Sequence, residues 1–373
     1  MKTLFVTHHY LAGFGGGFYA SRSLIHAFAQ LSETMTLLCP AREDAMPTVR
    51  PEGVRVVPVF DRTPRWKKAW HLLTGRLHRF EEAIRGELAR GGYDTVVFDS
   101  CYPSFRMIVP AQKAGCRVIT VHHNYQFEYV RDNYVFPVRL PMLLWTHRCE
   151  REAVRRSDLN LTLTSEDKDL LTHAYCRGAS ANIRVIGIFE PPFAPGTEPS
   201  EVEENVFLIT GDLGIRQTKA SLLDWLKGYY PILKEEYPDG RLILAGKNPH
   251  PRIRQFCREN GVELVDTPPD MEPVLLRGKY YICPISLGGG IKLRVMDGLR
   301  HGLPVVAHEV SARGYELFEG RYLFAYDSPA TFRAALRRLE RGDGEAARIV
   351  ALFRETFTFE AGLGRLRAIL QDL

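Results

Sequence analysis

The stretch that most constrains the fold of this chain covers residues 280–316. An apolar run at 280–285 predicts a buried strand, and three consecutive glycines then open a segment whose apolar residues recur at helical spacing. Gly302 and Pro304 end that helix and begin a second apolar strand. A strand, a helix and a strand in this order predict a parallel pair of strands. The sequence therefore favours an α/β fold.

The start of the predicted helix is also a candidate binding site for an anion. The glycines are Gly288, Gly289 and Gly290. They let a ligand approach the backbone, and the unpaired N–H groups of Gly289, Gly290 and Ile291 favour negative charge. Lys292 and Arg294 add two positive charges beside them. Many strand-to-helix connections use glycine only to turn the chain, so the spacing alone leaves both interpretations open.

Length and charge bound the class of protein. At 373 residues and 45% hydrophobic composition, the chain can form two domains with ordinary cores. Residues 1–200 hold 25 basic and 20 acidic side chains, so the net charge of +5 lies in the first half. Since no compact basic arm or known binding motif accompanies this excess, we do not expect a nucleic-acid partner.

The cysteines and the apolar runs limit the cellular compartments in which we expect the protein. The seven cysteines contain no C-x-x-C pair and favour a reducing environment over a zinc site or disulfides. The apolar core of the first ten residues is too short for a signal peptide and predicts a first strand instead. Since no run of about 18 apolar residues exists, we expect a cytoplasmic protein, attached at most to the inner face of the membrane.

The first half alternates strands and helices, which predicts a doubly wound parallel sheet. Its first loop holds a second glycine run, Gly15, Gly16 and Gly17. The pattern Gly15-x-Gly17-x-x-Ala20 formally meets the dinucleotide fingerprint, which keeps a nicotinamide-dependent oxidoreductase as an alternative. Against it, seven residues separate the strand from the first glycine, and the next predicted strand ends at Cys39 and Pro40 without the acid that binds ribose.

Polar residues follow a strand predicted at 117–121. They are His122, His123 and Asn124. Ligands bind at the carboxyl ends of strands in open parallel sheets, so these three residues are candidates for a site. A single histidine there more often serves packing or hydrogen bonding, and the adjacent pair is what favours a function.

Residues 65–80 combine five Lys or Arg with no acid, and their tryptophans, leucines and phenylalanine recur at helical spacing. A helix of this composition is typical of membrane interfaces. The alternative is an amphipathic helix that covers the sheet of its own domain.

A composition break divides the chain. Residues 190–204 contain four prolines and no apolar periodicity, which predicts a linker. We therefore predict an amino-terminal Rossmann-like domain at 1–190, a linker at 191–204 and a second Rossmann-like domain at 205–355. The predicted helix at 356–373 completes the chain.

The stretch around the three glycines resembles the donor-binding segment of family 4 glycosyltransferases, in a subset with three glycines. The matching residues are Pro284, Gly288, Gly289, Gly290, Lys292, Arg294 and Asp297. The resemblance extends more loosely over most of the chain. It implies the GT-B architecture, in which two Rossmann-like doubly wound domains face each other across a cleft. The second domain then holds the nucleotide sugar, and the last helix crosses back to the first domain.

The resemblance also implies a reaction. It suggests a metal-independent hexosyltransferase that needs no cofactor and moves a sugar, with retention, from a nucleotide-diphosphate sugar to a glycan or lipid-linked saccharide. Negative charge that builds on the departing pyrophosphate would be stabilised by the glycine N–H groups, Lys292 and Arg294. Asp297 would bind the ribose hydroxyls. His122 would lie near the reacting sugar, although His123 could hold that place equally.

Other residues take their roles from the same resemblance. His123, Asn124 and the loop Gly15–Gly17 would face the acceptor and the donor phosphate. Arg216 and Lys219 are the only basic residues near the place where many members carry a phosphate-binding pair, and they could equally be solvated. Many members carry a glutamate where Gly289 stands here. Its absence keeps open a catalytically silent GT-B scaffold that binds a sugar nucleotide or a partner.

Overall fold

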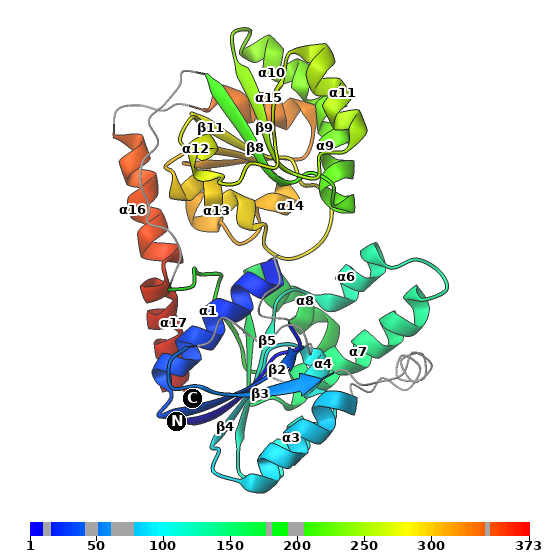
Figure 1. Ribbon diagram of the computed structural model, residues 1–373, viewed down its shortest axis with the longest axis vertical. Helices are drawn as coiled ribbons and strands as arrows, with labels where there is room; N and C mark the ends of the chain where they lie inside the picture. Colours follow the sequence, from blue (N-terminus) through cyan, green and yellow to red (C-terminus); the bar gives the residue numbers. More distant parts are fainter. Residues whose placement is uncertain (10–15, 42–50, 61–77, 177–180, 193–204, 340–343) are drawn as a thin grey trace. The chain divides into compact units, whose positions relative to one another are not determined.

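The computed structural model describes residues 1–9, 16–41, 51–60, 78–176, 181–192, 205–339 and 344–373. The chain divides into two compact units (Figure 1). The first unit comprises Met1–Ala194 with Phe357–Leu373, and the second comprises Pro195–Thr356. Most of the predicted linker, residues 193–204, lies outside the described residues. The same holds for residues 65–77 of the predicted basic helix and for Gly15.

A seven-stranded parallel sheet forms the centre of the first unit (Figure 1). Its strands are β1 (Lys2–Val6), β2 (Thr34–Ala41), β3 (Arg55–Phe60), β4 (Thr95–Phe98), β5 (Arg117–His122), β6 (Leu159–Thr162) and β7 (Ile183–Val185). They lie in the order β3-β2-β1-β4-β5-β6-β7. Because the order reverses between β1 and β4, the topological switch point lies at the carboxyl ends of these two strands.

Helices accompany the strands of this sheet. They are α1 (Gly16–Leu31), α3 (His78–Arg90), α4 (Cys101–Ser104), α5 (Ile108–Lys113), α6 (Gln126–Asn133), α7 (Arg139–Arg156), α8 (Ser165–Tyr175) and α17 (Phe359–Gln371). Apolar side chains of β1, β4 and β5 are fully buried, as expected for strands with both faces covered. In the part of the chain that the structure describes, no helix combines the length and apolar character that a membrane span requires.

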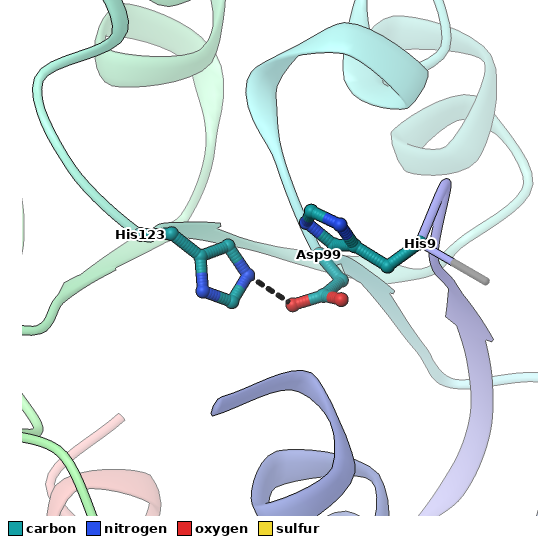
Figure 2. Close-up of side chains that lie close together, drawn as sticks. All are labelled: His9, Asp99 and His123. Carbon is teal, nitrogen blue, oxygen red and sulfur yellow. Dashed lines mark hydrogen bonds and ion pairs between the residues drawn. The ribbon is translucent and has the colours of Figure 1, made fainter. Parts of the chain in front are cut away.

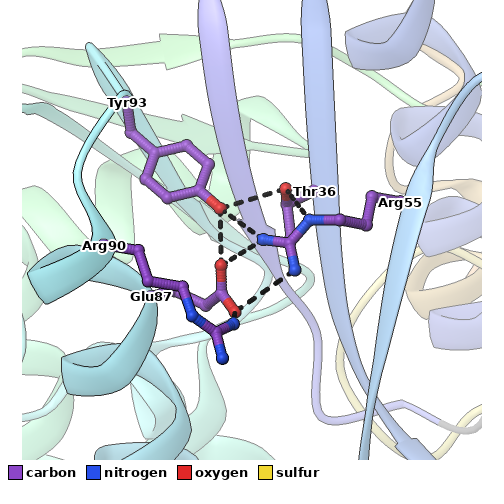
Figure 3. A network of polar contacts seen from close by, with 5 residues as sticks. All are labelled: Thr36, Arg55, Glu87, Arg90 and Tyr93. Carbon is purple, nitrogen blue, oxygen red and sulfur yellow. Dashed lines mark hydrogen bonds and ion pairs between the residues drawn. The ribbon is translucent and has the colours of Figure 1, made fainter.

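A buried glutamate ties α3 to the edge of this sheet (Figure 3). Glu87 is only 2% exposed and pairs with Arg55 of β3 and Arg90 of its own helix. The Tyr93 hydroxyl donates to Glu87 at 2.7 Å and lies 3.0 Å from the hydroxyl of Thr36 in β2. Burial raises the pKa of Glu87, but its partners outweigh burial and lower it. A buried carboxylate is tolerated here because each oxygen has donors.

Two further carboxylates fix the segment that follows β5. The backbone N–H of Tyr125 donates to Asp167 of α8 at 2.8 Å. The next N–H, of Gln126, donates to Glu150 of α7 at 2.6 Å, and the Tyr175 hydroxyl donates to the other Glu150 oxygen at 2.8 Å. Since Gln126 begins α6, these acids accept N–H groups that the helix itself leaves unpaired. They hold the backbone directly after His122 and His123.

The second unit contains a six-stranded parallel sheet (Figure 1). Its strands are β8 (Val206–Asp212), β9 (Arg241–Lys247), β10 (Glu263–Asp266), β11 (Tyr280–Cys283), β12 (Val305–His308) and β13 (Leu323–Tyr326). Their order is β10-β9-β8-β11-β12-β13, so the switch point lies between β8 and β11. Both units thus confirm the predicted fold of two doubly wound α/β domains.

The helices of the second unit are α9 (Arg216–Gly228), α10 (Tyr230–Glu236), α11 (Pro251–Asn260), α12 (Glu272–Leu275), α13 (Leu293–Arg300), α14 (Glu309–Ala312), α15 (Pro329–Arg337) and α16 (Glu345–Phe357). The sequence predicts one helix at 219–236, and the structure confirms helix over this range as two segments, α9 and α10. The structure breaks it at Tyr229, because Pro231 has no N–H to donate within a continuous helix.

The final helix, α17, packs within the first unit and contacts α1. Arg365 donates to the carbonyl oxygens of Ile186 and Ile188 at 2.9 and 3.2 Å. Gly362 faces the ring of Phe189 so closely that a Cβ there would lie 2.0 Å from the ring. Gly364 has open space around it. Helix α17 therefore packs against Phe189 through Gly362, whereas Gly364 makes no close contact.

Gly362→Ala should destabilise the first unit, since the added methyl group displaces Phe189. Overpacking of this kind costs about 1–3 kcal/mol, and about 2–4 °C of Tm follows for each kcal/mol. Gly364→Ala is the matched control on the same helix, and it should raise Tm slightly because alanine favours helix. Thermal unfolding of the two variants checks this. Equal effects would contradict the close contact between α17 and Phe189.

Glu150 should make stability depend on pH. Burial raises its pKa to about 8, despite the hydrogen bonds from Tyr175 and the backbone, which lower it. Between the normal value of 4.5 and about 8 the folded protein binds the extra proton, so the free energy of unfolding falls as pH rises. Glu150→Gln removes this titration. Its Tm relative to wild type should therefore increase from about pH 5 to about pH 8.5.

Glu82→Gln, on the exposed side of α3, serves as the control for the Glu150 experiment. It should leave the pH profile of Tm unchanged. Parallel profiles for wild type and Glu150→Gln would show that Glu150 does not titrate in this range.

Candidate functional site

Three side chains converge at the switch point of the first sheet (Figure 2). His9 follows β1, Asp99 follows β4 directly and His123 follows β5 directly. One potential ligand atom from each of the three side chains lies within 4.8 Å of the other two. The carboxyl ends of adjacent parallel strands meet at one edge of the sheet, which is why residues far apart in the sequence come together here.

Asp99 is the centre of this cluster. It is fully buried, and its two oxygens have separate partners. His123 Nε2 lies 2.7 Å from Oδ1, and the Thr7 hydroxyl donates to Oδ2 at 2.7 Å. Burial alone raises the pKa of Asp99, but His123, His9 and Ser21 lower it to about 2. The carboxylate is therefore ionised at neutral pH.

His9 lies on the other side of Asp99, with its ring edge-on to the His123 ring at a centroid distance of 5.2 Å. Burial lowers the pKa of His9 to about 4, and His123 adds to this effect while Asp99 opposes it. His9 is thus a neutral imidazole at pH 7. A Cβ on Gly17, in the first turn of α1, would lie 3.2 Å from the His9 ring. One predicted loop glycine therefore borders the cluster.

The bond to Asp99 fixes the chemistry of His123. An ionised carboxylate only accepts, so the proton of a neutral His123 resides on Nε2. Nδ1 then carries a lone pair, and this atom is buried with no hydrogen-bond partner among the described residues. A hydroxyl group of a ligand would satisfy it.

His122 occupies a different environment from its neighbour. It is the last residue of β5, and its Nε2 lies 3.0 Å from Oδ1 of Asn160 in β6. Burial lowers its pKa to about 4, although the Asn160 bond opposes the shift. Asn124 is half-buried, and its Oδ1 has no hydrogen-bond partner in the described part of the chain. Gly16 is the first residue of α1.

The cluster offers two imidazoles and one carboxylate, a set of donors that transition-metal ions accept. Its shortest internal contact, 2.7 Å between Asp99 and His123, is a hydrogen bond that a metal ion would have to replace. The same atoms serve equally as a hydrogen-bonding surface for hydroxyl groups.

In the second unit, the predicted glycine loop connects β11 to α13 at the switch point. Gly288 and Gly290 have φ values of +82° and +70°, which residues with a side chain rarely adopt. A Cβ on Gly288 would lie 2.7 Å from the Gln217 side chain of α9. The backbone N–H of Ser286 donates to the Ser221 hydroxyl at 3.1 Å. The loop is thus held against the first turns of α9.

Lys292 folds back over this loop. Its ammonium donates to the carbonyl oxygens of Gly288, Gly289 and Gly290 at 2.8, 2.9 and 3.1 Å. The Tyr315 hydroxyl donates to the Lys292 carbonyl at 2.9 Å. The lysine thereby shapes the glycine loop as well as placing a positive charge beside it.

Arg294 reaches from α13 to the end of β8. Its Nη2 donates to the Thr218 hydroxyl at 3.1 Å and to the Asp212 carbonyl at 3.4 Å. A Cβ on Gly211 would lie 2.1 Å from Arg294 Nε, so only glycine fits beside this guanidinium. Nη1 is buried and has no hydrogen-bond partner among the described residues. It is a cationic donor that an acceptor oxygen would satisfy.

The other predicted donor-binding residues lie on α9 and α13. Arg216 is the exposed first residue of α9, and the half-buried Lys219 follows one turn later. Positive side chains at a helix start oppose the helix dipole, and an anion bound there would relieve this. Asp297 is half-buried in α13, and burial raises its pKa against the charges of Arg300, His301 and Arg294.

Sequence reasoning missed His9, Asp99 and Gly211 as site residues. His9 and Asp99 both follow predicted strands, and that position was the available signal. Gly211 stands out only once Arg294 is seen to lie against it.

Searches against known proteins give one partial relative in sequence. An "Uncharacterized 44.6 kDa protein in cps region" of Klebsiella pneumoniae is 24% identical over 163 residues. The match spans 39% of this chain and 41% of that protein.

Solved structures match over the full chain. Sucrose-phosphate synthase from Thermosynechococcus elongatus has a TM-score of 0.68 at 15% identity, covering 100% of this chain and 98% of that one. The lipopolysaccharide outer core galactosyltransferase WaaB has a TM-score of 0.65 at 14% identity, with both chains covered completely. HepE from Anabaena, in complex with UDP and glucose, has a TM-score of 0.66 at 13% identity and the same coverage. These similarities establish the GT-B fold.

Two family models match the sequence. The model described as "Glycosyl transferase 4-like domain" matches residues 15–188, and the one described as "Glycosyl transferases group 1" matches residues 204–341. Together they account for most of the chain. The protein therefore belongs to the GT-B glycosyltransferases of this type, with a 4-like first domain and a group 1 second domain.

Proposed function

We propose that this glycosyltransferase moves a hexose from a nucleotide-diphosphate sugar to a glycan or lipid-linked saccharide, with retention at the anomeric carbon and without a metal. The observation that carries the proposal is the cationic switch point of the second unit. There Arg294 presents a buried donor without a partner, beside a glycine loop and Lys292. A pyrophosphate group matches this combination in charge and in acceptor oxygens.

The proposed role of this site is to stabilise the leaving group. When the bond between the anomeric carbon and the phosphate oxygen breaks, negative charge builds on the pyrophosphate. The N–H groups of Gly289, Gly290 and Ile291, with Lys292 and Arg294, would stabilise that charge. Arg216 and Lys219 would contact the phosphates from the start of α9. Asp297 would accept hydrogen bonds from the ribose.

Lys292 has a second task in this proposal. Its ammonium donates to three glycine carbonyls. A phosphate near the loop would compete for these donors, so the lysine would exchange part of its contacts with the backbone for contacts with the ligand. The triple-glycine donor loop would in this way couple its own conformation to donor binding.

The first unit would bind the acceptor and the reacting sugar. Each of the two histidines has a bonded Nε2 and a buried Nδ1 without a hydrogen-bond partner among the described residues, so hydrogen bonding alone does not separate them. We favour His123 for the place beside that sugar because it lies with His9 and Asp99 at the switch point of the sheet. The catalytic role predicted for His122 stays untested. Asn124 and the loop Gly15–Gly17 would contact the acceptor or the donor phosphate.

Two comparisons support a sugar-nucleotide donor. Structures of HepE from Anabaena contain UDP and UDP-glucose, and that protein shares the fold of this chain. We further propose a cytoplasmic enzyme that contacts the membrane peripherally through residues 65–80. The anomeric configuration of the product, read by proton NMR, tests retention.

One nucleoside diphosphate from a panel of UDP, GDP, ADP, CMP and NADH should raise the Tm of the protein. A ligand at 100 times its Kd adds about 2.7 kcal/mol. Lys292→Ala and Arg294→Gln should each reduce the shift, because each removes a cation from the phosphate site. Lys227→Ala, at the far end of α9, removes the same charge and should keep the shift. A shift with NADH alone would overturn the proposal.

His123→Ala and Asp99→Asn should lower kcat by about two orders of magnitude, since both remove the oriented acceptor at Nδ1. The assay measures release of the nucleoside diphosphate from the sugar nucleotide that carries the stabilising base. Nucleotide-induced Tm shifts should persist, because the nucleotide binds in the second unit. His173→Ala, an exposed histidine of α8, is the control.

The His122 variant decides between the two histidines. If His122→Ala loses activity while His123→Ala does not, the catalytic histidine is His122. If neither variant affects turnover and the nucleotide still binds, the protein is a silent scaffold.

A further inference from the structure

The turn between α6 and α7 carries an exposed apolar patch. Of the eleven exposed large hydrophobic side chains among the described residues, six lie between 134 and 144. We name these six the hairpin patch: Tyr134, Val135, Phe136, Val138, Leu140 and Leu144. Phe136 is 84% exposed, and Val135 and Leu140 are each 62% exposed. Water is a poor solvent for so many clustered apolar side chains, which marks an interaction surface.

The patch lies at the outer end of a helical hairpin. Helices α6 and α7 pack against each other, and Figure 1 shows their connecting turn away from the parallel sheet of the same unit. The apolar side chains therefore do not belong to the core of this unit. A partner with a large flat surface can therefore contact these side chains without contacting the sheet.

Within residues 133–149, the charged side chains are all basic. No acidic residue occurs between residues 133 and 149. Arg139 lies within the patch, and Arg148 and Arg151 follow on α7. All three arginines are exposed and form no ion pair in the part of the chain that the structure describes. The surface therefore combines apolar side chains with unpaired positive charge.

Along α7 after Arg139, the exposed apolar side chains come first and the exposed arginines follow. Leu140, Leu144 and Arg148 are four residues apart, so they share one face of the helix. The exposed face thus changes from apolar at the turn to basic further along. Leu140 and Arg148 are about 12 Å apart along the axis, at 1.5 Å per residue.

We propose that the hairpin patch inserts into the surface of an anionic lipid bilayer. Interfacial elements bury their apolar side about 5–10 Å into the boundary between headgroups and acyl chains. With the turn at that depth, Arg148 and Arg151 lie at the level of the headgroup phosphates, and Arg139 can extend its guanidinium towards them. Tyr134 has the amphipathic ring that membrane interfaces favour.

A second copy of this chain fits the patch less well. A symmetric contact would place the same surface on both partners, so the arginines of one copy would approach those of the other. An anionic bilayer supplies the missing counter-charge over a wide area. Membrane insertion of the hairpin patch does not depend on which donor or acceptor the enzyme uses. The hairpin patch is also a different segment from residues 65–80.

Sedimentation with vesicles tests the inference on the full chain. The probes are vesicles of phosphatidylcholine alone and of phosphatidylcholine with about 30% phosphatidylglycerol. Wild type should bind the anionic vesicles. The triple variant Phe136→Ser, Leu140→Gln and Leu144→Gln should lose at least about tenfold in binding. Arg148→Gln with Arg151→Gln should reduce binding to anionic vesicles and leave binding to phosphatidylcholine unchanged.

Leu317→Gln is the matched control, because Leu317 in the second unit is more exposed than either Leu140 or Leu144. It should bind vesicles as wild type does. Thermal unfolding, with and without the stabilising nucleotide, checks that every variant is folded and tests the donor site separately. Three outcomes overturn the inference: no vesicle binding by wild type, full binding by the triple variant, or a wild-type dimer that the triple variant converts to a monomer.

Discussion

A parallel sheet covered on both faces leaves little room for charged side chains except at the ends of its strands. In β1, β4 and β5 the side chains between the ends are buried, and charged residues occur only at the strand ends, with Lys2 and Arg117 at the starts of β1 and β5. Asp99 and His123 directly follow β4 and β5, and Arg294 reaches the end of β8 from the neighbouring helix. Both candidate sites therefore lie at switch points, where two adjacent loops diverge and leave space for a ligand.

Close approach of backbone and side chain then shapes each site. Gly211 lets the Arg294 guanidinium lie against the end of β8, and Gly17 lets α1 begin against the His9 ring. In both cases the glycine matters for the space that a Cβ would fill, and its partner lies far away in the sequence. Buried acidic side chains complete the support, since Glu150 and Asp167 hold the segment after His123 by its N–H groups.

The alternation of strands and helices was enough to predict both doubly wound domains, because apolar runs and glycine turns are local signals. The strand-to-helix unit around Gly288–Gly290 was predicted for the same reason. The break at Tyr229, two residues before Pro231, was missed because the apolar periodicity of the sequence continues across it. The partnership of His9 with Asp99 and His123 depends on strand order, which no local pattern contains. For His122 and His123, adjacency in sequence concealed that alternate residues of a strand face opposite sides.

The two sites manage charge in opposite ways, and this difference suits a division of labour. In the first unit an ionised Asp99 is hydrogen-bonded to His123 and Thr7, and burial keeps His9 neutral, so the cluster presents hydrogen-bonding groups around one buried carboxylate. Such a surface suits the hydroxyl groups of sugars. In the second unit Arg294 and Lys292 bond backbone carbonyls and a hydroxyl, and none of the contacts described for them is with a carboxylate. Two cations beside a glycine loop form an environment that matches the charge and acceptor oxygens of a pyrophosphate group.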